Sequence, residues 1–223
     1  MYRHIKDNSM ALQVNEIFYS IQGESIYMGL PFVFVRLSGC NLRCTYCDTQ
    51  YAYSEGDVYS IDQLIEKIAA FGCRRIALTG GEPLLQDDTP LLATRLLDAG
   101  HRVVAETNGS MDIGRLDARC SRVMDIKCPS SGVHLHNNPV NMARLTPYDQ
   151  VKFVIGNRDD YDFAKTLLGA LPSHLSEDRI LFSTVAGKLT PAELARWILA
   201  DHLSVRLQVQ LHKIIWPEQD RGV

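Results

Sequence analysis

The sequence predicts an α/β protein, an incomplete (β/α) barrel of about six parallel strands. After residue 30, short β-branched segments alternate with amphipathic helical segments, and the links between them are short. Such alternation gives parallel strands joined by right-handed crossovers. With 223 residues, the chain is a little short for a closed eight-fold barrel of about 250 residues. We expect a single domain, 1–223, because no linker, repeat or low-complexity segment interrupts the pattern.

The predicted strands are rich in β-branched residues and bounded by Gly, Pro or polar residues. They are residues 31–37, 75–79, 101–106, 122–126, 150–155, 179–182 and 205–209, with extra N-terminal strands around 14–20.

Helix-start signals follow several of these strands. Ser60 and Gln63 have the spacing of a capping box before an apolar stripe. Thr89-Pro90 and Thr190-Pro191 each place a proline near a helix start. Gly100 is expected to end the second helix, and residues 157–168 form a weaker further helix.

Composition excludes several classes of function. Charged residues make up 22% of the chain and its net charge is −3, without a cluster of Lys and Arg that would bind nucleic acid. The apolar runs are far shorter than the ~20 residues that span a bilayer, and no apolar stretch at the N-terminus marks a secretory signal. We therefore expect a cytoplasmic protein that binds neither nucleic acid nor membrane.

Three of the six cysteines fall within one short loop after the predicted strand 31–37. Cys40, Cys44 and Cys47 form a Cys-x3-Cys-x2-Cys pattern. Structural zinc normally takes four protein ligands, and no His lies nearby in the sequence. Three thiolates suit a [4Fe-4S] cluster that leaves one iron open to an exogenous ligand. A zinc loop completed by Cys128 or His134 remains the alternative.

This loop, with Tyr46 before the third cysteine, resembles the signature of the radical S-adenosylmethionine (SAM) superfamily. The resemblance implies that SAM binds the open iron and is cleaved reductively to a 5′-deoxyadenosyl radical. Thr79-Gly80-Gly81-Glu82-Pro83 is similar to the superfamily's motif for the SAM amino group. Glycines there allow a close backbone approach, and Glu82 offers an acceptor to an ammonium. Glu106-Thr107-Asn108-Gly109 resembles a further SAM-contacting segment.

The flanking residues resemble the 7-carboxy-7-deazaguanine synthase family. They are the segment from Glu16 to Gln22-Gly23-Glu24-Ser25, where Ser25 replaces a usual glycine, then Cys47-Asp48-Thr49, and finally Gln210-Leu211-His212-Lys213. The resemblance implies a carbon–nitrogen lyase that converts 6-carboxy-5,6,7,8-tetrahydropterin to 7-carboxy-7-deazaguanine, a queuosine precursor. Ammonia leaves during a radical ring contraction, and SAM is regenerated. The alternative is a radical SAM activase of a glycyl radical enzyme, which would need neither Gln22-Gly23-Glu24 nor Arg36.

The resemblance also implies site residues, although it assigns no catalytic acid or base. The pterin substrate is expected at Ile21, Gln22, Gly23, Glu24, Arg36, Thr79 and His212, with Arg36 meeting the carboxylate and His212 approaching from the last strand. SAM is expected at Gly81, Glu82, Asn108, Asp125, Ile126, Lys127, Ser183, Thr184 and Val185. At 125–127, where relatives read Ser-Pro-Lys, only Lys127 matches firmly.

Further cofactors and partners follow from the same resemblance. The hydroxyl of Thr49 is expected to reach a Mg²⁺ ion held against the substrate, since Mg²⁺ is a hard cation that prefers oxygen ligands. An external electron donor such as flavodoxin or ferredoxin would reduce the cluster, and the protein is expected to be a homodimer.

Two features of the sequence are left open. His134 and His136 form an alternating pair that could bind metal, although a solvated loop explains them as well. Some relatives end soon after their His-Lys pair and use the terminal carboxylate at the substrate. This sequence continues to Val223, so that contact is not carried over.

Overall fold

The structure is a computed structural model that describes residues 10–223. Residues 1–9, on which the expectation of no secretory signal partly rests, lie outside the described residues.

Nine strands in residues 10–223 form one sheet in the order β3-β1-β2-β4-β5-β6-β7-β8-β9. From β2 to β9 every neighbouring pair is parallel, so the predicted α/β class with a largely parallel sheet is confirmed, with seven parallel strands in place of about six. The strands are β1 (Ala11–Ile21), β2 (Pro31–Leu37), β3 (Asp57–Ser60), β4 (Arg75–Gly80), β5 (Arg102–Thr107), β6 (Ser121–Ile126), β7 (Gln150–Ile155), β8 (Ile180–Thr184) and β9 (Arg206–Gln208).

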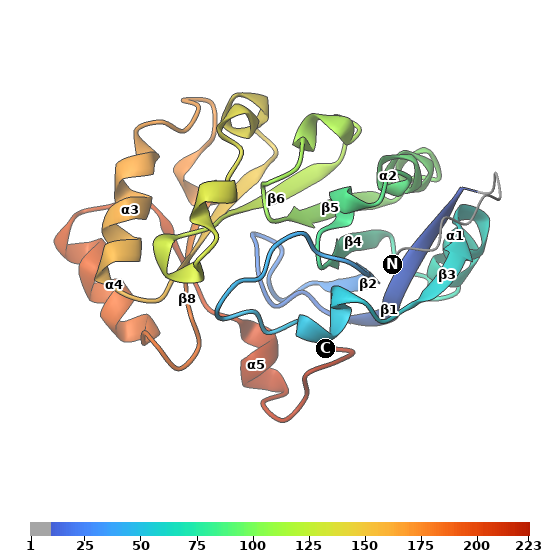
Figure 1. The fold of residues 1–223 in the computed structure, drawn as a ribbon, viewed down its shortest axis with the longest axis horizontal. Helices are drawn as coiled ribbons and strands as arrows, with labels where there is room; N and C mark the ends of the chain where they lie inside the picture. Colours follow the sequence, from blue (N-terminus) through green and yellow to red (C-terminus); the bar gives the residue numbers. More distant parts are fainter. Residues whose placement is uncertain (1–9) are drawn as a thin grey trace.

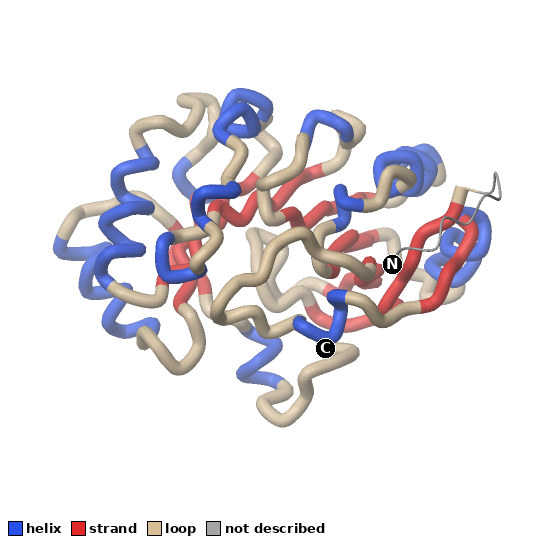
Figure 2. Tube along the Cα trace, in the orientation of Figure 1, coloured by secondary structure: helices blue, strands red, loops and turns tan. Residues whose placement is uncertain are grey.

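The longer helices lie around the outside of the strands (Figures 1 and 2). Ser60 and Gln63 form the predicted capping box, in which each side chain bonds the other residue's backbone N–H. Gly100 lies just after the second helix with φ +83°. The α-helices are α1 (Ile61–Ala69), α2 (Thr89–Asp98), α3 (Arg158–Leu168), α4 (Pro191–Ala200) and α5 (Leu211–Ile215).

The two strands at the N-terminal edge of the sheet are antiparallel to their neighbours. One edge of β1 pairs with β2 and the other with β3. The strand β3 was not predicted, because it has only four residues, two of them exposed, and its last residue, Ser60, is the cap of the following helix.

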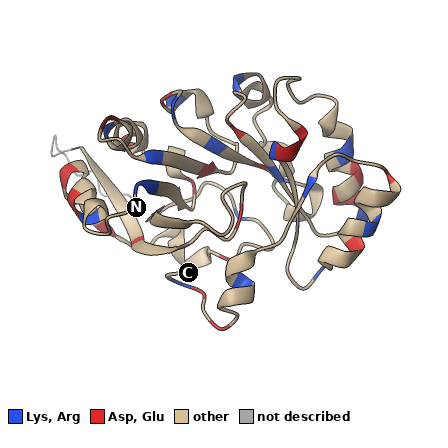
Figure 3. Cartoon of the chain, turned by 180° about the vertical axis from the view of Figure 1, so that it is seen from behind, with Lys and Arg blue, Asp and Glu red and all other residues tan. Residues whose placement is uncertain are grey.

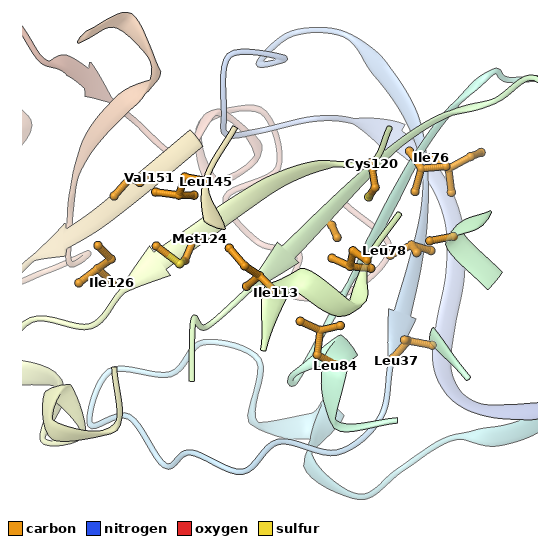
Figure 4. Packing of buried hydrophobic residues seen from close by; sticks show 14 of the residues in the cluster. Leu37, Ile76, Leu78, Leu84, Ile113, Cys120, Met124, Ile126, Leu145 and Val151 are labelled. Atoms are coloured by element: carbon orange, nitrogen blue, oxygen red, sulfur yellow. The ribbon is translucent and has the colours of Figure 1, made fainter. Parts of the chain in front are cut away.

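Each face of the sheet packs against its own apolar layer. The larger layer packs the sheet against the helices and includes Leu37, Leu78 and Met124 (Figure 4). The smaller layer includes Phe32, Phe34 and Val123. Strands buried on both faces read as continuous apolar runs, as β2 does.

The alternation along β2 positions one charged residue. Side chains two residues apart in a strand point to the same face, so Arg36 shares a face with Phe32 and Phe34. Phe34 and Arg36 both line the cavity described below, whereas Leu37 belongs to the helix-covered core.

Charged residues of both signs are interspersed over the helices and loops, and some lie on the strands (Figure 3). Across residues 10–223, every helix falls short of the length and apolar character that a membrane crossing needs.

Candidate active site

A cavity of about 580 Å³ opens at the carboxyl ends of the parallel strands. In (β/α) barrels this is the edge where side chains from several strands meet. Most of the site residues predicted from the sequence line this cavity: Ile21, Gln22, Gly23, Glu24, Arg36, Cys40, Cys44, Cys47, Thr49, Thr79, Gly81, Asn108, Asp125, Lys127, Thr184, Val185 and His212. Glu82, Ile126 and Ser183 are buried and do not line it.

The three loop cysteines are free thiols that open into the cavity, each partly exposed. Burial raises the pKa of Cys40 and of Cys44, so a bound metal would be needed to hold them as thiolates at neutral pH. In the described part of the chain, no three Cys, His, Asp or Glu side chains come together as ligands of a single metal ion.

The zinc alternative also lacks its fourth ligand. Cys128 is fully buried, and its sulfur contacts the backbone oxygen of Ile126. His134 and His136 lie on a short 3-10 helix and do not line the cavity, and Leu135 between them is 87% exposed.

Two glycines let the loop after β4 approach the cysteine loop. A Cβ atom on Gly81 would lie 2.0 Å from the backbone oxygen of Gly39, and Gly80 has φ +141°. The N–H of Glu82 donates to that same Gly39 oxygen at 2.8 Å. Only glycine tolerates this approach, which brings the predicted SAM segment directly beside Cys40.

Glu82 does not face the cavity as the sequence suggested. Its carboxylate is fully buried and accepts hydrogen bonds from Thr107 Oγ1 and from the backbone N–H groups of Leu84 and Asn108. Burial raises the pKa of Glu82 although these bonds oppose the effect. The side chain thus ties the ends of β4 and β5 together.

A chain of hydrogen bonds joins the ends of β1, β4 and β5 at the cavity wall. Gln22 Nε2 donates to Glu106 Oε1 at 2.9 Å, and Thr79 Oγ1 donates to Glu106 Oε2 at 2.8 Å. The Gln22 carbonyl oxygen Oε1 in turn accepts from the backbone N–H of Glu24 at 3.1 Å. The wall therefore presents amide and carboxylate groups that can form hydrogen bonds with the polar edge of a heterocycle.

Arg36 lies in the cavity wall but has a partner within the protein. Its Nε donates to Glu16 Oε1 at 2.6 Å, and both side chains are less than one-fifth exposed. In residues 10–223, its two terminal nitrogen groups make no hydrogen bond. They are the pair that binds a carboxylate with two parallel bonds.

His212 lies on the short helix α5 and not on a strand, so the predicted strand around 205–209 ends earlier, at Gln208. A Cβ atom on Gly23 would lie 2.1 Å from His212 Nδ1, so the ring packs directly on the Gln22-Gly23 segment. Burial lowers the pKa of His212, although the Glu24 carboxylate opposes this, and the imidazole is neutral at pH 7.

Thr49 and Asp48 lie side by side at the cavity rim. Thr49 Oγ1 donates to Asp48 Oδ1 at 3.1 Å, and Lys213 Nζ lies 2.8 Å from Asp48 Oδ2. Burial opposes ionisation of Asp48, but the Lys213 ammonium outweighs it and lowers the pKa of the carboxyl to about 2.

Sequence reasoning missed several cavity residues, among them Glu106, Lys152, Asp48 and Val223. Glu106 was recognised only as part of a SAM-contacting segment. Lys152 carried a usable signal, because it is a lone charge in the apolar strand β7, as Arg36 is in β2.

The C-terminal segment carried no such signal. It returns to β1, where the N–H of Gly222 donates to Glu16, and to the short 3-10 helix after the cysteine loop, where the Tyr51 hydroxyl donates to the Asp220 oxygen.

Comparison with known proteins agrees with this geometry. The Radical SAM superfamily matches residues 34–136, which hold the cysteine loop and the two segments predicted to contact SAM. A 7-carboxy-7-deazaguanine synthase of Chlorobaculum tepidum is 44% identical over 215 residues, which cover 95% of this chain and 97% of that protein. A 7-carboxy-7-deazaguanine synthase of Koribacter versatilis is 37% identical over 228 residues, covering 95% and 100%.

A solved structure shares the fold. The crystal structure of QueE from Escherichia coli has a TM-score of 0.71 and 22% sequence identity, and the match covers 91% of this chain and 95% of that one. The fold and the cysteine loop together define a radical SAM enzyme. Within that class, the chain belongs to the 7-carboxy-7-deazaguanine synthase family.

Proposed function

We propose that the protein converts 6-carboxy-5,6,7,8-tetrahydropterin to 7-carboxy-7-deazaguanine with loss of ammonia. The observation that carries the proposal is that one cavity holds both the three cysteines and the Ile21–Glu24 segment. An activase of a glycyl radical enzyme would act on a protein and has no use for such a segment, so that alternative is set aside.

Cys40, Cys44 and Cys47 would hold the [4Fe-4S] cluster, with SAM beside Gly81 and Asn108. When bound, the cluster and SAM supply the radical that starts the ring contraction. The chain's own residues bind and orient the substrate. Arg36 would pair with the substrate carboxylate through its two terminal nitrogen groups, which make no hydrogen bond within residues 10–223.

The opposite edge of the pterin would meet the hydrogen-bonded residues of the wall. Glu106 is held by Gln22 and Thr79 on two sides, so the direction of its carboxylate is fixed. A carboxylate oxygen has further lone pairs, and these can accept N–H groups of the heterocycle. Hydrogen bonds at both edges of the ring fix the reacting carbon in one position. Positioning of this kind lowers the activation barrier of the reaction.

The test is anaerobic reconstitution with iron and sulfide, followed by turnover with the carboxypterin and mass analysis of the products. We expect the deazaguanine product, with ammonia released. Cys44→Ala should lose the iron–sulfur absorbance and SAM cleavage, while the control Cys120→Ala, a fully buried thiol outside the cavity, should keep both. A wild-type enzyme that cleaves SAM but leaves the carboxypterin unchanged would falsify the proposed substrate.

We also propose that Thr49 helps to hold Mg²⁺ against the substrate. Support comes from its place at the cavity rim, next to Asp48, which stays ionised far below neutral pH. Two protein oxygens do not complete an octahedral shell, so the site would form only with substrate oxygens and water present.

Thr49→Val keeps the shape of the side chain and removes its oxygen. We expect wild-type turnover to rise with added Mg²⁺ and the Val variant to lose that response while keeping its cluster. Wild-type turnover that ignores both EDTA and Mg²⁺ would exclude the ion.

An external one-electron donor such as flavodoxin or ferredoxin and a homodimeric assembly complete the proposal. The donor is supported by the exposure of Asn41, Arg43 and Thr45 on the cysteine loop, which gives a partner access to the cluster.

The homodimer is supported by partly exposed aromatic rings on the outer edge, where Tyr19 stacks on Phe71. We place the protein in the cytoplasm, because all six cysteines are unpaired.

A further inference from the structure

A row of four charged side chains with alternating sign crosses the cavity wall. Lys152 Nζ lies 2.7 Å from Glu24 Oε2 and 3.7 Å from Asp125 Oδ2, and Lys127 Nζ lies 2.9 Å from that same Asp125 oxygen. Each of the four side chains is less than one-fifth exposed. Buried charges at this density persist only when they are paired.

The sheet itself places the middle of this row. Asp125 on β6 and Lys152 on β7 are partners in the parallel register, so their side chains leave neighbouring strands on one face. Glu24 comes from the segment after β1, which is 128 residues away from Lys152 in the sequence. Lys152 is thus the link between the N-terminal segment and the strand β6.

The row joins the two halves of the cavity. Under the proposed function, Glu24 belongs to the pterin side, and Asp125 and Lys127 belong to the SAM side. Gln210 Nε2 donates to the second Glu24 oxygen at 2.8 Å, so both oxygens of that carboxylate have fixed partners.

Asp125 carries the observation that points to a ligand. The ammonium groups of Lys127 and Lys152 both pair with its Oδ2 atom, whereas its Oδ1 atom is buried without any hydrogen-bond partner in residues 10–223. Asp125 lines the cavity, and a buried acceptor without a donor is unfavourable. A hydroxyl or N–H group of a bound molecule would satisfy this oxygen.

We propose, on the basis of the proposed function, that Lys152 is a positioning residue of the reaction. Its ammonium pairs with the carboxylates of Glu24 and Asp125 and fixes their direction. It thereby turns Asp125 Oδ1 toward the SAM side and keeps Glu24 in place on the pterin side. Lys152 acts through these two residues and makes no ligand contact of its own.

The test uses double-mutant cycles on the full-length, cluster-reconstituted protein. SAM affinity is measured by equilibrium dialysis and by the change that SAM makes in the EPR spectrum of the reduced cluster. Lys152→Met should weaken SAM binding about tenfold or more, and Asp125→Asn should weaken it similarly. Because both changes disrupt one arrangement, the double variant should be no more than about twofold weaker than Asp125→Asn alone.

A second cycle tests the pterin side. Lys152→Met and Glu24→Gln should each raise the KM for the carboxypterin, and the double variant should match Glu24→Gln within about twofold. Lys152→Arg keeps the charge and should restore part of both effects. Lys165→Met is the matched control, because this lysine also pairs with a carboxylate, Asp201, but lies on α3 away from the cavity. It should change neither quantity.

Three results would overturn the proposal. The first is that Lys152→Met leaves both SAM affinity and KM unchanged. The second is that its effects simply multiply with those of Asp125→Asn and Glu24→Gln. If Lys152→Met takes up no cluster, Lys152→Arg replaces it in both cycles. The third result is that Lys152→Arg abolishes SAM binding whether residue 125 is Asp or Asn, and this also rejects the proposal. Failure of the proposed substrate is a separate result, because the SAM cycle requires no carboxypterin.

Discussion

Ser25 has a backbone conformation that residues other than glycine rarely adopt. Its φ is +65°, and this position is where the sequence departs from the glycine that is usual in the family. A left-handed conformation costs a residue with a Cβ atom roughly 1–2 kcal/mol. The Ser25 hydroxyl offsets part of this cost, because it accepts a hydrogen bond from the Tyr27 N–H at 3.1 Å.

Two substitutions separate these effects. Ser25→Ala keeps the strain and loses the bond, so we expect it to lower the free energy of unfolding by about 1 kcal/mol. Ser25→Gly loses the bond but also the strain, and it should stay within about 1 kcal/mol of wild type. Urea denaturation of the three proteins measures this, and an Ala variant as stable as wild type would contradict the assignment.

Some residues of the site could be predicted from the sequence and others could not. The thiols, Gln22 and Asn108 were found because short motifs carry them. Glu82 lies in such a motif, yet its buried hydrogen bonds depend on Thr107, and no spacing rule gives that pairing. The contact of Lys152 with Glu24 was out of reach, because it requires knowing which distant segments become neighbours.

Between elements, the approach of the β4 loop to the cysteine loop is the tightest packing at the site. Gly81→Ala would place a Cβ atom 2.0 Å from a backbone oxygen, which no side-chain movement can relieve. We expect the two loops to separate, so that the variant takes up at least severalfold less iron and sulfide on reconstitution.

Gly169→Ala provides the control for this change. Gly169 follows α3 with an ordinary helical conformation, and a Cβ atom there meets nothing within 4 Å. Iron content equal to wild type in both variants would show that the loop approach is not required for the cluster.

Element boundaries were predicted well where the pattern was strong. The strand 31–37 and the helix start at the Ser60 cap agree with the structure because apolar runs and capping chemistry are local. The helix α5 was taken for the end of a strand, since Leu207 to Leu211 alternates like one. Its five residues are too short for a helical period to show.

At the scale of the whole molecule, the last residues of the chain return to the middle of β1 beside the cavity. Arg221 pairs with Glu55, and the N–H of Gly222 donates to Glu16, the partner of Arg36. Val223 itself lines the cavity (Figure 1 shows this end of the chain near β1). The segment 217–223 therefore covers the side of the site where the substrate carboxylate is proposed to bind.

Deleting residues 217–223 should change stability little, because exposed ion pairs such as Arg221–Glu55 contribute about 0–1 kcal/mol. It should open the cavity beside Arg36 and raise the KM for the carboxypterin by tenfold or more, with iron content unchanged. Thermal unfolding, iron analysis and steady-state kinetics check the three parts. An unaltered KM would mean that the segment has no part in binding.

The return of the last residues to the first strands has a consequence for the order of events during synthesis. A ribosome adds roughly 5–20 residues per second, so the cysteine loop emerges some 10–30 seconds before the residues that cover the cavity. During that interval, the three thiols lie in a nascent chain whose barrel is still incomplete. If the cluster is inserted before the chain leaves the ribosome, the cysteine loop is open and prone to oxidation. If it is inserted afterwards, the cluster has to pass the C-terminal segment that covers the cavity.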